Sequence, residues 1–422
     1  MPAPSLTGLS RRGFMATAAG TALAGSLLSG RASAETQPDA SGIRRADPIT
    51  PAERANRLAR LQQLMRQNGI GAAMVEAGSS LFYFTGINWW RSERLTAALL
   101  PAEGEICIVT PEFEEPSIRE MLVVPGEVRI WNEHQNPHQI VADWAAEQKL
   151  GDRPMAIEDT VRFFAVNGLR KAAPSLQLVS AEPIVTACRM IKTAPEIALM
   201  QEAADIVDAA YRSLSGKFEV GMDGSDIFAM MSAAISGFDG QSPSGGVQIN
   251  EGSALPHGSK IRETIKEGSV ILMDCGCRVD GYYADISRTL VFGEPSKRQR
   301  EVFQQVCKGQ AAAMAAAQPG AEAGKVDDAV RALYESMGYG PGYATPGLPH
   351  RTGHGIGLDI HEPVNLVHGE KTRLRPGMCF SNEPGLYIPG EFGVRIEDCF
   401  YITDTGPKYF TQPPTSLDAP FG

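Results

Sequence analysis

The order of hydrophobic and polar positions divides the chain into a first stretch of short alternating elements and a second stretch that opens with a long helix. From Pro51 onward, apolar residues recur at three- and four-residue spacing through Leu58, Leu61 and Leu64, which predicts an amphipathic helix. Apolar runs typical of strands follow at 72–76, 81–84, 95–100 and 106–110. More helix and strand patterns continue to Ala187 without a catalytic motif, so we interpret this part as an α/β scaffold.

A long helix is predicted just after residue 190. Thr193-Ala194-Pro195-Glu196 combines an N-cap threonine, a proline in the first turn and a glutamate placed to complete a capping box. One apolar stripe then runs through Ile197, Met200, Ala204, Val207, Tyr211 and Leu214. We therefore expect one domain over 35–190 and a second over 191–422.

The composition of the 422 residues, 43% hydrophobic and 21% charged, is that of a globular protein and excludes disordered, collagen-like and coiled-coil classes. The length allows two or three domains. Acidic residues outnumber basic ones by 49 to 39, and this net charge of −10 argues against nucleic acid or anionic lipid as the main partner. A small molecule or a peptide is left as the expected ligand.

The first 34 residues have the pattern of an export signal. Ser10-Arg11-Arg12-Gly13-Phe14 matches the twin-arginine signature, and a weakly apolar run leads to the small-x-small site Ala32-Ser33-Ala34. We expect cleavage there and a periplasmic or secreted product, with a general secretory signal or a cytoplasmic tail as alternatives. No later apolar run reaches the ~18 residues of a membrane span, so no stable membrane insertion is expected after cleavage.

The seven cysteines are odd in number and scattered, so they imply no disulfide framework. Cys275 and Cys277 would share one face of a strand, but a zinc site needs a second pair at suitable spacing. We interpret all seven as buried small side chains: Cys107, Cys188, Cys275, Cys277, Cys307, Cys379 and Cys399.

Two carboxylates lie in a predicted hairpin of apolar strands. The run from Val270 ends in Asp274, and a second strand after the turn-forming Asp280-Gly281 carries Asp285 among apolar residues. A carboxylate buried among aliphatic side chains needs a cation. Pairing in the hairpin would bring the two acids together, although an ion pair with Arg288 would explain Asp285 equally well.

Three of the seven histidines fall within twelve residues, at His350, His354 and His361, and glycines frame the middle one. Glu383 and Glu397 each end a short apolar segment further on. Four carboxylates and one imidazole match two divalent cations with a bridging hydroxide. Such oxygen-rich ligation suits manganese, cobalt or iron better than the cysteine and histidine sites of structural zinc.

With these segments in this order, the chain resembles the pita-bread metallopeptidases, which include aminopeptidase P, prolidase and methionine aminopeptidase, with creatinase as a metal-free relative. The resemblance rests on the eleven-residue step from Asp274 to Asp285 and on the Gly-His-Gly, Glu-Pro-Gly and Arg-x-Glu segments. It implies an α+β fold of two domains, a creatinase-like N-terminal domain and a pita-bread catalytic domain. Methionine aminopeptidases resemble only the C-terminal half, so the first 190 residues favour the proline-directed branch.

The resemblance also implies roles for individual residues. Asp274 would hold one metal, His354 and Glu383 the other, while Asp285 and Glu397 would bridge the two. Glu383 would also shuttle the proton, and His361 would stabilise the tetrahedral intermediate. His350 and His257 would orient the substrate, unless His257 is a surface-loop residue. Arg395 would either grip a substrate carboxylate or neutralise its acidic neighbours.

The expected activity is hydrolysis of the Xaa-Pro bond in a proline-containing peptide, by a dipeptidase or an aminopeptidase with two divalent ions. Manganese is the first expectation and cobalt, iron or zinc the alternatives. The rivals are a same-fold enzyme acting on a non-peptide molecule, such as a creatinase-like amidinohydrolase or a sulfonium-compound lyase, and a binding protein without catalysis.

Trp89 and Trp90 follow each other in a predicted turn of the scaffold domain. One indole should lie on each side of an extended segment, which leaves at least one exposed unless both belong to the core. In the enzymes that the chain resembles, this loop reaches a neighbouring subunit's active site. A homodimer or homotetramer is therefore expected.

Overall fold

The computed structural model describes residues 37–150, 152–256 and 258–421, which form two compact units. One unit contains Thr50–Arg189, and the other contains the segment 37–49 together with the chain from Met190 onward. Within the described ranges, no helix combines the length and the apolar character that a membrane crossing requires. The expected export signal, 1–34, lies outside the described residues and stays a prediction.

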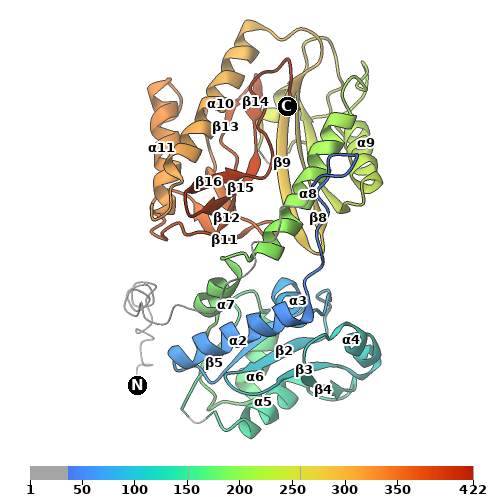
Figure 1. The fold of residues 1–422 in the computed structure, drawn as a ribbon, viewed down its shortest axis with the longest axis vertical. Coiled ribbons are helices and arrows are strands. Elements are labelled where there is room, and N and C mark those ends of the chain that lie inside the picture. The colour runs from blue at the N-terminus through green and yellow to red at the C-terminus, as the bar shows by residue number, and fades with distance from the viewer. Residues whose placement is uncertain (1–36, 151, 257, 422) are drawn as a thin grey trace. The chain divides into compact units, whose positions relative to one another are not determined.

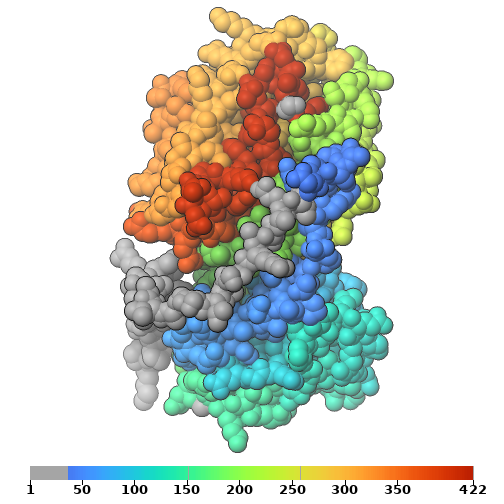
Figure 2. Space-filling model, viewed as in Figure 1, coloured from blue at the N-terminus to red at the C-terminus, as the bar shows by residue number. Residues whose placement is uncertain are grey.

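The segment 37–49 departs from the expectation that it belongs to the N-terminal domain, because it lies against the second unit. Arg44 pairs with Asp205 at 2.8 Å and Arg45 with Glu202 at 3.0 Å, and both acids lie on helix α8 (Ala194–Ser213). Figure 2 shows this segment in blue against the green residues of the second unit. A boundary drawn from local patterns misses it, since its partners lie about 160 residues further along the chain.

The first unit is built on one six-stranded sheet of order β4-β3-β2-β1-β5-β6. Strands β1, β2 and β3 pair antiparallel and are buried throughout, which explains their apolar runs. The strands are β1 (Ala72–Glu76), β2 (Ala97–Pro101), β3 (Ile106–Pro111), β4 (Gly126–Trp131), β5 (Met155–Ile157) and β6 (Leu178–Ser180). The helices are α2 (Pro51–Gln67), α3 (Ser79–Thr85), η1 (Glu112–Glu114), α4 (Glu115–Met121), α5 (Pro137–Glu147), α6 (Phe163–Ala172) and α7 (Glu182–Arg189).

The predicted strand at 81–84 is wrong, because these residues lie in helix α3. Gly86 ends the helix in the left-handed region at φ 86°, and the Thr85 hydroxyl donates to the Leu81 carbonyl at 2.6 Å. Four apolar residues in a row fit a strand and a buried helical turn equally well. Only packing in the first unit decides between the two.

The two tryptophans stack on each other instead of pointing to opposite sides. Their ring centroids are 4.6 Å apart and the planes differ by 18°. Trp90 is 67% exposed, which confirms that one indole is exposed and contradicts the alternative that both belong to the core.

The second unit contains a three-stranded sheet, β7-β8-β9, a five-stranded sheet, β11-β10-β12-β15-β16, and the hairpin β13-β14. Its strands are β7 (Gln241–Ile249), β8 (Val270–Val279), β9 (Tyr282–Val291), β10 (Gly353–Gly355), β11 (Glu362–Leu366), β12 (Cys379–Asn382), β13 (Gly385–Ile388), β14 (Phe392–Arg395), β15 (Asp398–Thr403) and β16 (Gly406–Tyr409). Its helices are α8 (Ala194–Ser213), α9 (Gly224–Gly237), η2 (Asn250–Ala254), α10 (Lys297–Ala316) and α11 (Ala323–Ser336). Helices α8 and α9 pack on β7–β9, and α10 and α11 pack on the strands that follow (Figure 1).

The two strongest local predictions in this unit are confirmed. Helix α8 begins with the Thr193–Glu196 capping box. The turn between β8 and β9 places Asp280 at φ 46° and Gly281 at φ 84°, the two positive values that a tight hairpin turn requires.

All seven cysteines are free thiols, as predicted. Six are buried and Cys307 is half-buried, so the expectation of burial fails in part at that position.

Candidate metal centre

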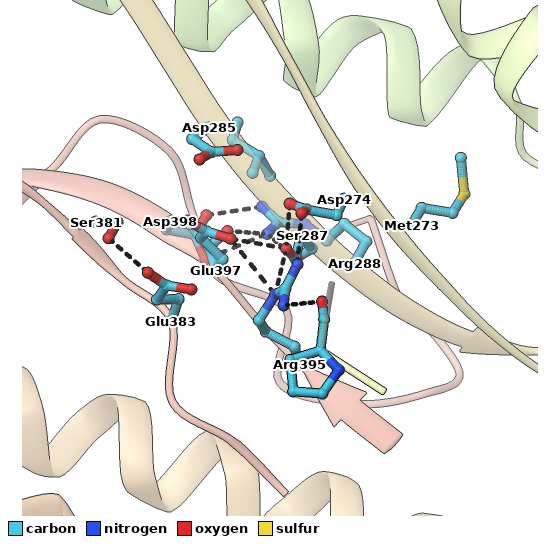
Figure 3. A network of polar contacts seen from close by, with 12 residues as sticks. Met273, Asp274, Asp285, Ser287, Arg288, Ser381, Glu383, Arg395, Glu397 and Asp398 are labelled. Atoms are coloured by element: carbon cyan, nitrogen blue, oxygen red, sulfur yellow. Dashed lines mark hydrogen bonds and ion pairs between the residues drawn. The ribbon is translucent and has the colours of Figure 1, made fainter. Parts of the chain in front are cut away.

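Five side chains from different segments gather at one place in the second unit, and Figure 3 shows the four carboxylates among them. They come from β8, from β9, from β10, from the residue after β12, and from the turn between β14 and β15: Asp274, Asp285, His354, Glu383 and Glu397. The structure thus brings together the five residues to which the sequence analysis gave ligand roles.

The hairpin register explains how Asp274 and Asp285 meet. Asp274 pairs with Ser287, and Asp285 pairs with Gly276. The two carboxylates therefore occupy diagonal positions on the same face of the β8–β9 pair, and neither faces an opposite bulky side chain. The eleven-residue step produces this arrangement because the turn takes two residues and side chains alternate along each strand.

His354 is held in the orientation of a metal ligand. Its Nδ1 lies 3.0 Å from the Gly355 carbonyl and donates to it, so the unprotonated Nε2 faces the acids. Nε2 lies 3.3 Å from Glu383 Oε1 and 3.9 Å from Asp285 Oδ2. Burial lowers the pKa of His354 to about 3, and the neighbouring His361 adds to this effect. A neutral nitrogen lone pair directed at carboxylate oxygens needs a cation between them.

Glu397 supplies the clearest unsatisfied group of the site. Its side chain is 2% exposed, and its Oε1 atom has no hydrogen-bond partner among the described residues. One donor atom from each of Asp285, His354 and Glu397 falls within 4.8 Å of the others. Because a buried carboxylate oxygen without a partner is costly, this atom is positioned to bind a metal ion.

The carboxylates repel one another strongly enough to change their protonation. Burial raises the pKa of Asp285 and of Glu397 well above the ordinary value, and the neighbouring carboxylates raise both further. Burial also raises the pKa of Glu383 from 4.5 to about 7, opposed by the positive charge of Arg395. Protonation or bound cations must therefore compensate the negative charge of this cluster.

Arg395 is the cation that contacts this cluster most directly, through its three guanidinium nitrogens. Its Nη2 lies 2.5 Å from Asp274, and its Nε donates to the Ser287 hydroxyl at 2.9 Å and lies 3.6 Å from Glu397. Nη1 donates to the Tyr387 hydroxyl at 3.1 Å. The side chain is 3% exposed, so its geometry corresponds to neutralisation of acidic neighbours, the second of the two roles considered for it.

The donor set fits two divalent cations. Four carboxylates carry up to four negative charges, and Arg395 compensates one of them. Oxygen-rich sites with one imidazole suit hard or borderline divalent ions, and two such ions would bind the unpaired Glu397 Oε1 and the lone pair of the unprotonated His354 Nε2.

The two other histidines of the motif also lie at this site. The ring of His361 lies 4.2 Å from that of His354, edge to face, and the side chain is exposed. His350 Nδ1 donates to the Arg351 carbonyl at 2.7 Å, and its Nε2 accepts from the Tyr387 hydroxyl at 2.9 Å. His257 lies outside the described residues, so its proposed role stays a prediction.

The structure corrects one alternative and adds two residues. Arg288 pairs with Asp398 at 2.7 Å, which removes the interpretation that it neutralises Asp285. Ser287 lies between Asp274 and Glu397, at 2.8 and 2.7 Å, and its single proton can serve only one of them at a time. Tyr387 links Arg395 to His350. Sequence reasoning missed both residues, because a serine and a tyrosine inside strands carry no signal of their own.

Comparison with known proteins agrees with this geometry. Residues 198–404 match the model of metallopeptidase family M24, and residues 57–191 match the creatinase/prolidase N-terminal domain. An Xaa-Pro dipeptidase from Lactobacillus helveticus is 32% identical over 362 residues, which covers 84% of this chain and 96% of that protein.

Two solved structures show the same fold over the whole catalytic and N-terminal parts. Dipeptidase PepE from Mycobacterium ulcerans superposes with a TM-score of 0.80 at 30% identity, covering 88% of this chain and 99% of that one. A prolidase from Thermococcus sibiricus gives 0.78 at 31% identity, covering 85% and 97%. The chain belongs to metallopeptidase family M24, and the expected two-domain α+β fold with a pita-bread catalytic domain is confirmed.

Proposed function

We propose that the protein hydrolyses the peptide bond before proline, as an Xaa-Pro dipeptidase or aminopeptidase that uses two divalent metal ions. The observation that carries this proposal is the ligand set itself: the unpaired Glu397 Oε1 and the His354 Nε2 lone pair lie in one cluster of carboxylates. The relatives named as Xaa-Pro dipeptidase and prolidase support proline-containing peptides as the substrate class.

In this proposal Asp274 would hold one ion, His354 and Glu383 would hold the other, and Asp285 and Glu397 would contribute to both. When bound, the two ions lower the pKa of a shared water and polarise the scissile carbonyl. The Glu383 carboxylate, which accepts from the Ser381 hydroxyl at 3.2 Å, takes a proton from the attacking water. It then returns this proton to the proline nitrogen as the carbon–nitrogen bond breaks.

The surrounding residues position the substrate and stabilise charge. The exposed His361 imidazole donates a hydrogen bond to the carbonyl oxygen as negative charge develops there. His350, fixed by Tyr387 and by the Arg351 carbonyl, orients the peptide. A proline amide has no N–H, so a site that acts on it must recognise other parts of the substrate.

The decisive experiment incubates the metal-reconstituted mature protein with an Xaa-Pro dipeptide and an Xaa-Pro-Xaa tripeptide. Cleavage of the dipeptide alone would indicate a dipeptidase, and cleavage of the tripeptide an aminopeptidase. Cleavage of neither, together with turnover of an amidino or sulfonium compound, would refute peptide hydrolysis and support the non-peptide alternative.

We propose manganese as the native metal and export by the twin-arginine pathway, and the two proposals are connected. Copper and zinc outrank manganese in intrinsic affinity, so the site would bind manganese only where these competing metals are scarce. A chain that folds and binds metal in the cytoplasm before export would acquire manganese there and keep it. Replacing Arg11 and Arg12 by lysine should leave active enzyme in the cytoplasm.

Rerouting the mature chain through an export pathway for unfolded proteins tests the connection. The product should carry zinc or copper and show reduced activity. Full manganese occupancy in the rerouted protein would contradict it.

We also propose a homodimer or homotetramer in which the loop with Trp89 and Trp90 contacts a neighbouring subunit. The 67% exposure of Trp90 supports this proposal, since a large apolar side chain at the surface favours a protein contact. Sedimentation of the wild type and of Trp90→Ala tests it. A monomeric wild type would refute the assembly, and an unchanged assembly in the variant would refute the role of the loop.

A further inference from the structure

Helix α11 carries a buried ion pair outside the ligand set. Asp327 and Arg331 are one helical turn apart, with Nε 2.7 Å from Oδ2 and Nη2 3.2 Å from Oδ1. Asp327 is fully buried, and the Arg331 side chain is 9% exposed. An ion pair at such depth costs desolvation energy, and apolar residues of similar volume often support a fold equally well. Its other contacts show what the pair holds in place.

Arg331 binds the carbonyl groups of the segment that leads to the motif histidines. Nη1 donates to the carbonyls of Gly342 at 2.8 Å and Leu348 at 2.9 Å, and Nη2 donates to that of His350 at 2.6 Å. The ring of Tyr343 lies over the guanidinium carbon at 3.7 Å. Only the several donors of a guanidinium can reach three carbonyls and a carboxylate at once.

Asp327 binds the chain on the other side of residue 351. Its Oδ1 accepts from the backbone N–H of Thr352 at 3.1 Å and from the Thr352 hydroxyl at 2.7 Å. Its Oδ2 accepts from the N–H of His368 at 3.0 Å. The ion pair therefore fixes the backbone immediately before and immediately after Arg351, at His350 and Thr352, and Thr352 lies two residues before His354.

The fixed backbone in turn holds two groups of the proposed mechanism. The His350 ring extends from one held residue to the Tyr387 hydroxyl at 2.9 Å. The carbonyl of Thr352, the other held residue, accepts from the backbone N–H of Glu383 at 2.9 Å. A displacement of this segment would move His350 and Glu383 together.

We propose that Asp327 and Arg331 are positioning residues for catalysis, which act on the reaction through His350 and Glu383 without touching substrate. The proposal rests on the proposed function, because it takes the roles of these two residues from it. The same unit offers a matched control. Asp208 and Arg212 form a pair of the same spacing in α8, with Nε 2.9 Å from Oδ2, but Arg212 is 54% exposed.

The first test compares Arg331→Lys with Arg212→Lys on an Xaa-Pro dipeptide. A lysine keeps the charge at position 331 but cannot make the same set of contacts, so kcat should fall about 10- to 100-fold, the scale of losing an outer support of a metal site, with two metal ions still bound per chain. KM should change less than kcat, and Arg212→Lys should behave as the wild type. Asp327→Asn, which keeps the side-chain shape, gives a second measurement with the same expectation if Arg331→Lys does not fold.

The second test separates positioning from general stability. In a His350→Ala background, Arg331→Lys should lower kcat/KM by a smaller factor than in the wild type, because one of the two groups through which Arg331 acts is already removed. The same factor in both backgrounds, or a lower Tm with unchanged kcat, would overturn the proposal, as would full activity of His350→Ala. By contrast, a wild-type enzyme that cleaves no Xaa-Pro peptide would refute the proposed function instead.

Discussion

A buried carboxylate of the first unit and the carboxylates of the metal centre are compensated in opposite ways. In the first unit, Glu76 ends strand β1 with a fully buried side chain, and Arg162 satisfies both of its oxygens, through Nε at 3.0 Å and its backbone N–H at 3.1 Å. In the second unit, burial raises the pKa of Asp285, Glu383 and Glu397, neighbouring carboxylates raise it further, and Arg395 contacts the cluster mainly through Asp274. The scaffold supplies a cation to its buried acid, whereas the metal centre leaves a deficit of positive charge.

This difference separates a structural acid from a functional one. The Glu76 carboxylate, which is paired within the first unit, contributes to stability, and its loss should affect stability alone. A buried carboxylate without a cation from the fold is tolerated because a bound ion or a proton neutralises its charge. Groups with such perturbed pKa values concentrate at functional sites. The four predictions below test whether this distinction holds.

The largest effect is expected from Asp285→Ala. The loss of a residue that serves both ions should reduce activity by far more than the ~100-fold that loss of an outer-shell partner costs, and metal content should fall with it. The first unit should stay folded, which circular dichroism and limited proteolysis can show. Full activity with two metals bound in this variant would refute the assigned site.

His361→Ala should reduce kcat by about 10²-fold, the scale of losing one donor to a developing oxyanion. Metal content should not change, because His361 lies beside His354 and is not one of the five proposed metal ligands. Metal analysis and kinetics of the single variant decide the matter: a lost metal ion would make His361 a ligand.

Removal of the metal should make stability depend on pH in one direction. In the metal-free protein the pKa of Glu383 is raised from 4.5 to about 7, so the folded state binds more protons than the unfolded chain between these values. The contribution of Glu383 to the free energy of unfolding is then largest below pH 4.5. It falls by roughly 3 kcal/mol as the pH rises from 4.5 through 7. Denaturant unfolding of chelated and metal-loaded protein measures this. Equal pH dependence of the free energy of unfolding in both forms would show that uncompensated charge on these carboxylates does not cause the effect.

The smallest effect compares two conservative changes in the metal-free protein. Glu76→Gln should lower the free energy of unfolding by about 2 kcal/mol, less than for a fully buried pair because Arg162 is 31% exposed. Asp285→Asn should instead raise it, because burial and the neighbouring acids raise the pKa of the Asp285 carboxyl, so that folding at neutral pH must protonate this group or leave it charged beside other acids, and an amide requires neither. Urea unfolding gives both signs, and Glu76→Gln should leave kcat unchanged once metal is restored. A change of the same sign in both unfolding free energies would mean that the fold compensates the charges of Glu76 and Asp285 in the same way.

The sequence predicted those parts of the fold that depend on local signals. Thr193 and Glu196 form the capping box of α8, and Asp280-Gly281 form the hairpin turn, because their side chains and backbone angles act within a few residues. The run 81–84 was ambiguous because its helical state depends on contacts outside the run, such as the bond from the Tyr83 hydroxyl to the Cys188 carbonyl. The segment 37–49 shows the same limit at the scale of a domain.

For the site, the sequence by itself determined which residues gather, through spacing within the hairpin and through glycine-framed segments in a fixed order. Only the tertiary structure decided how their charges are distributed. It pairs Arg288 with Asp398, directs Arg395 to Asp274, leaves Glu397 Oε1 without a partner, and ties His350 to α11 through Arg331. The physical reason is that a residue's type fixes which contacts it can make, while its partners and its loss of water are fixed by strands and helices that are distant in sequence and meet only in the folded unit.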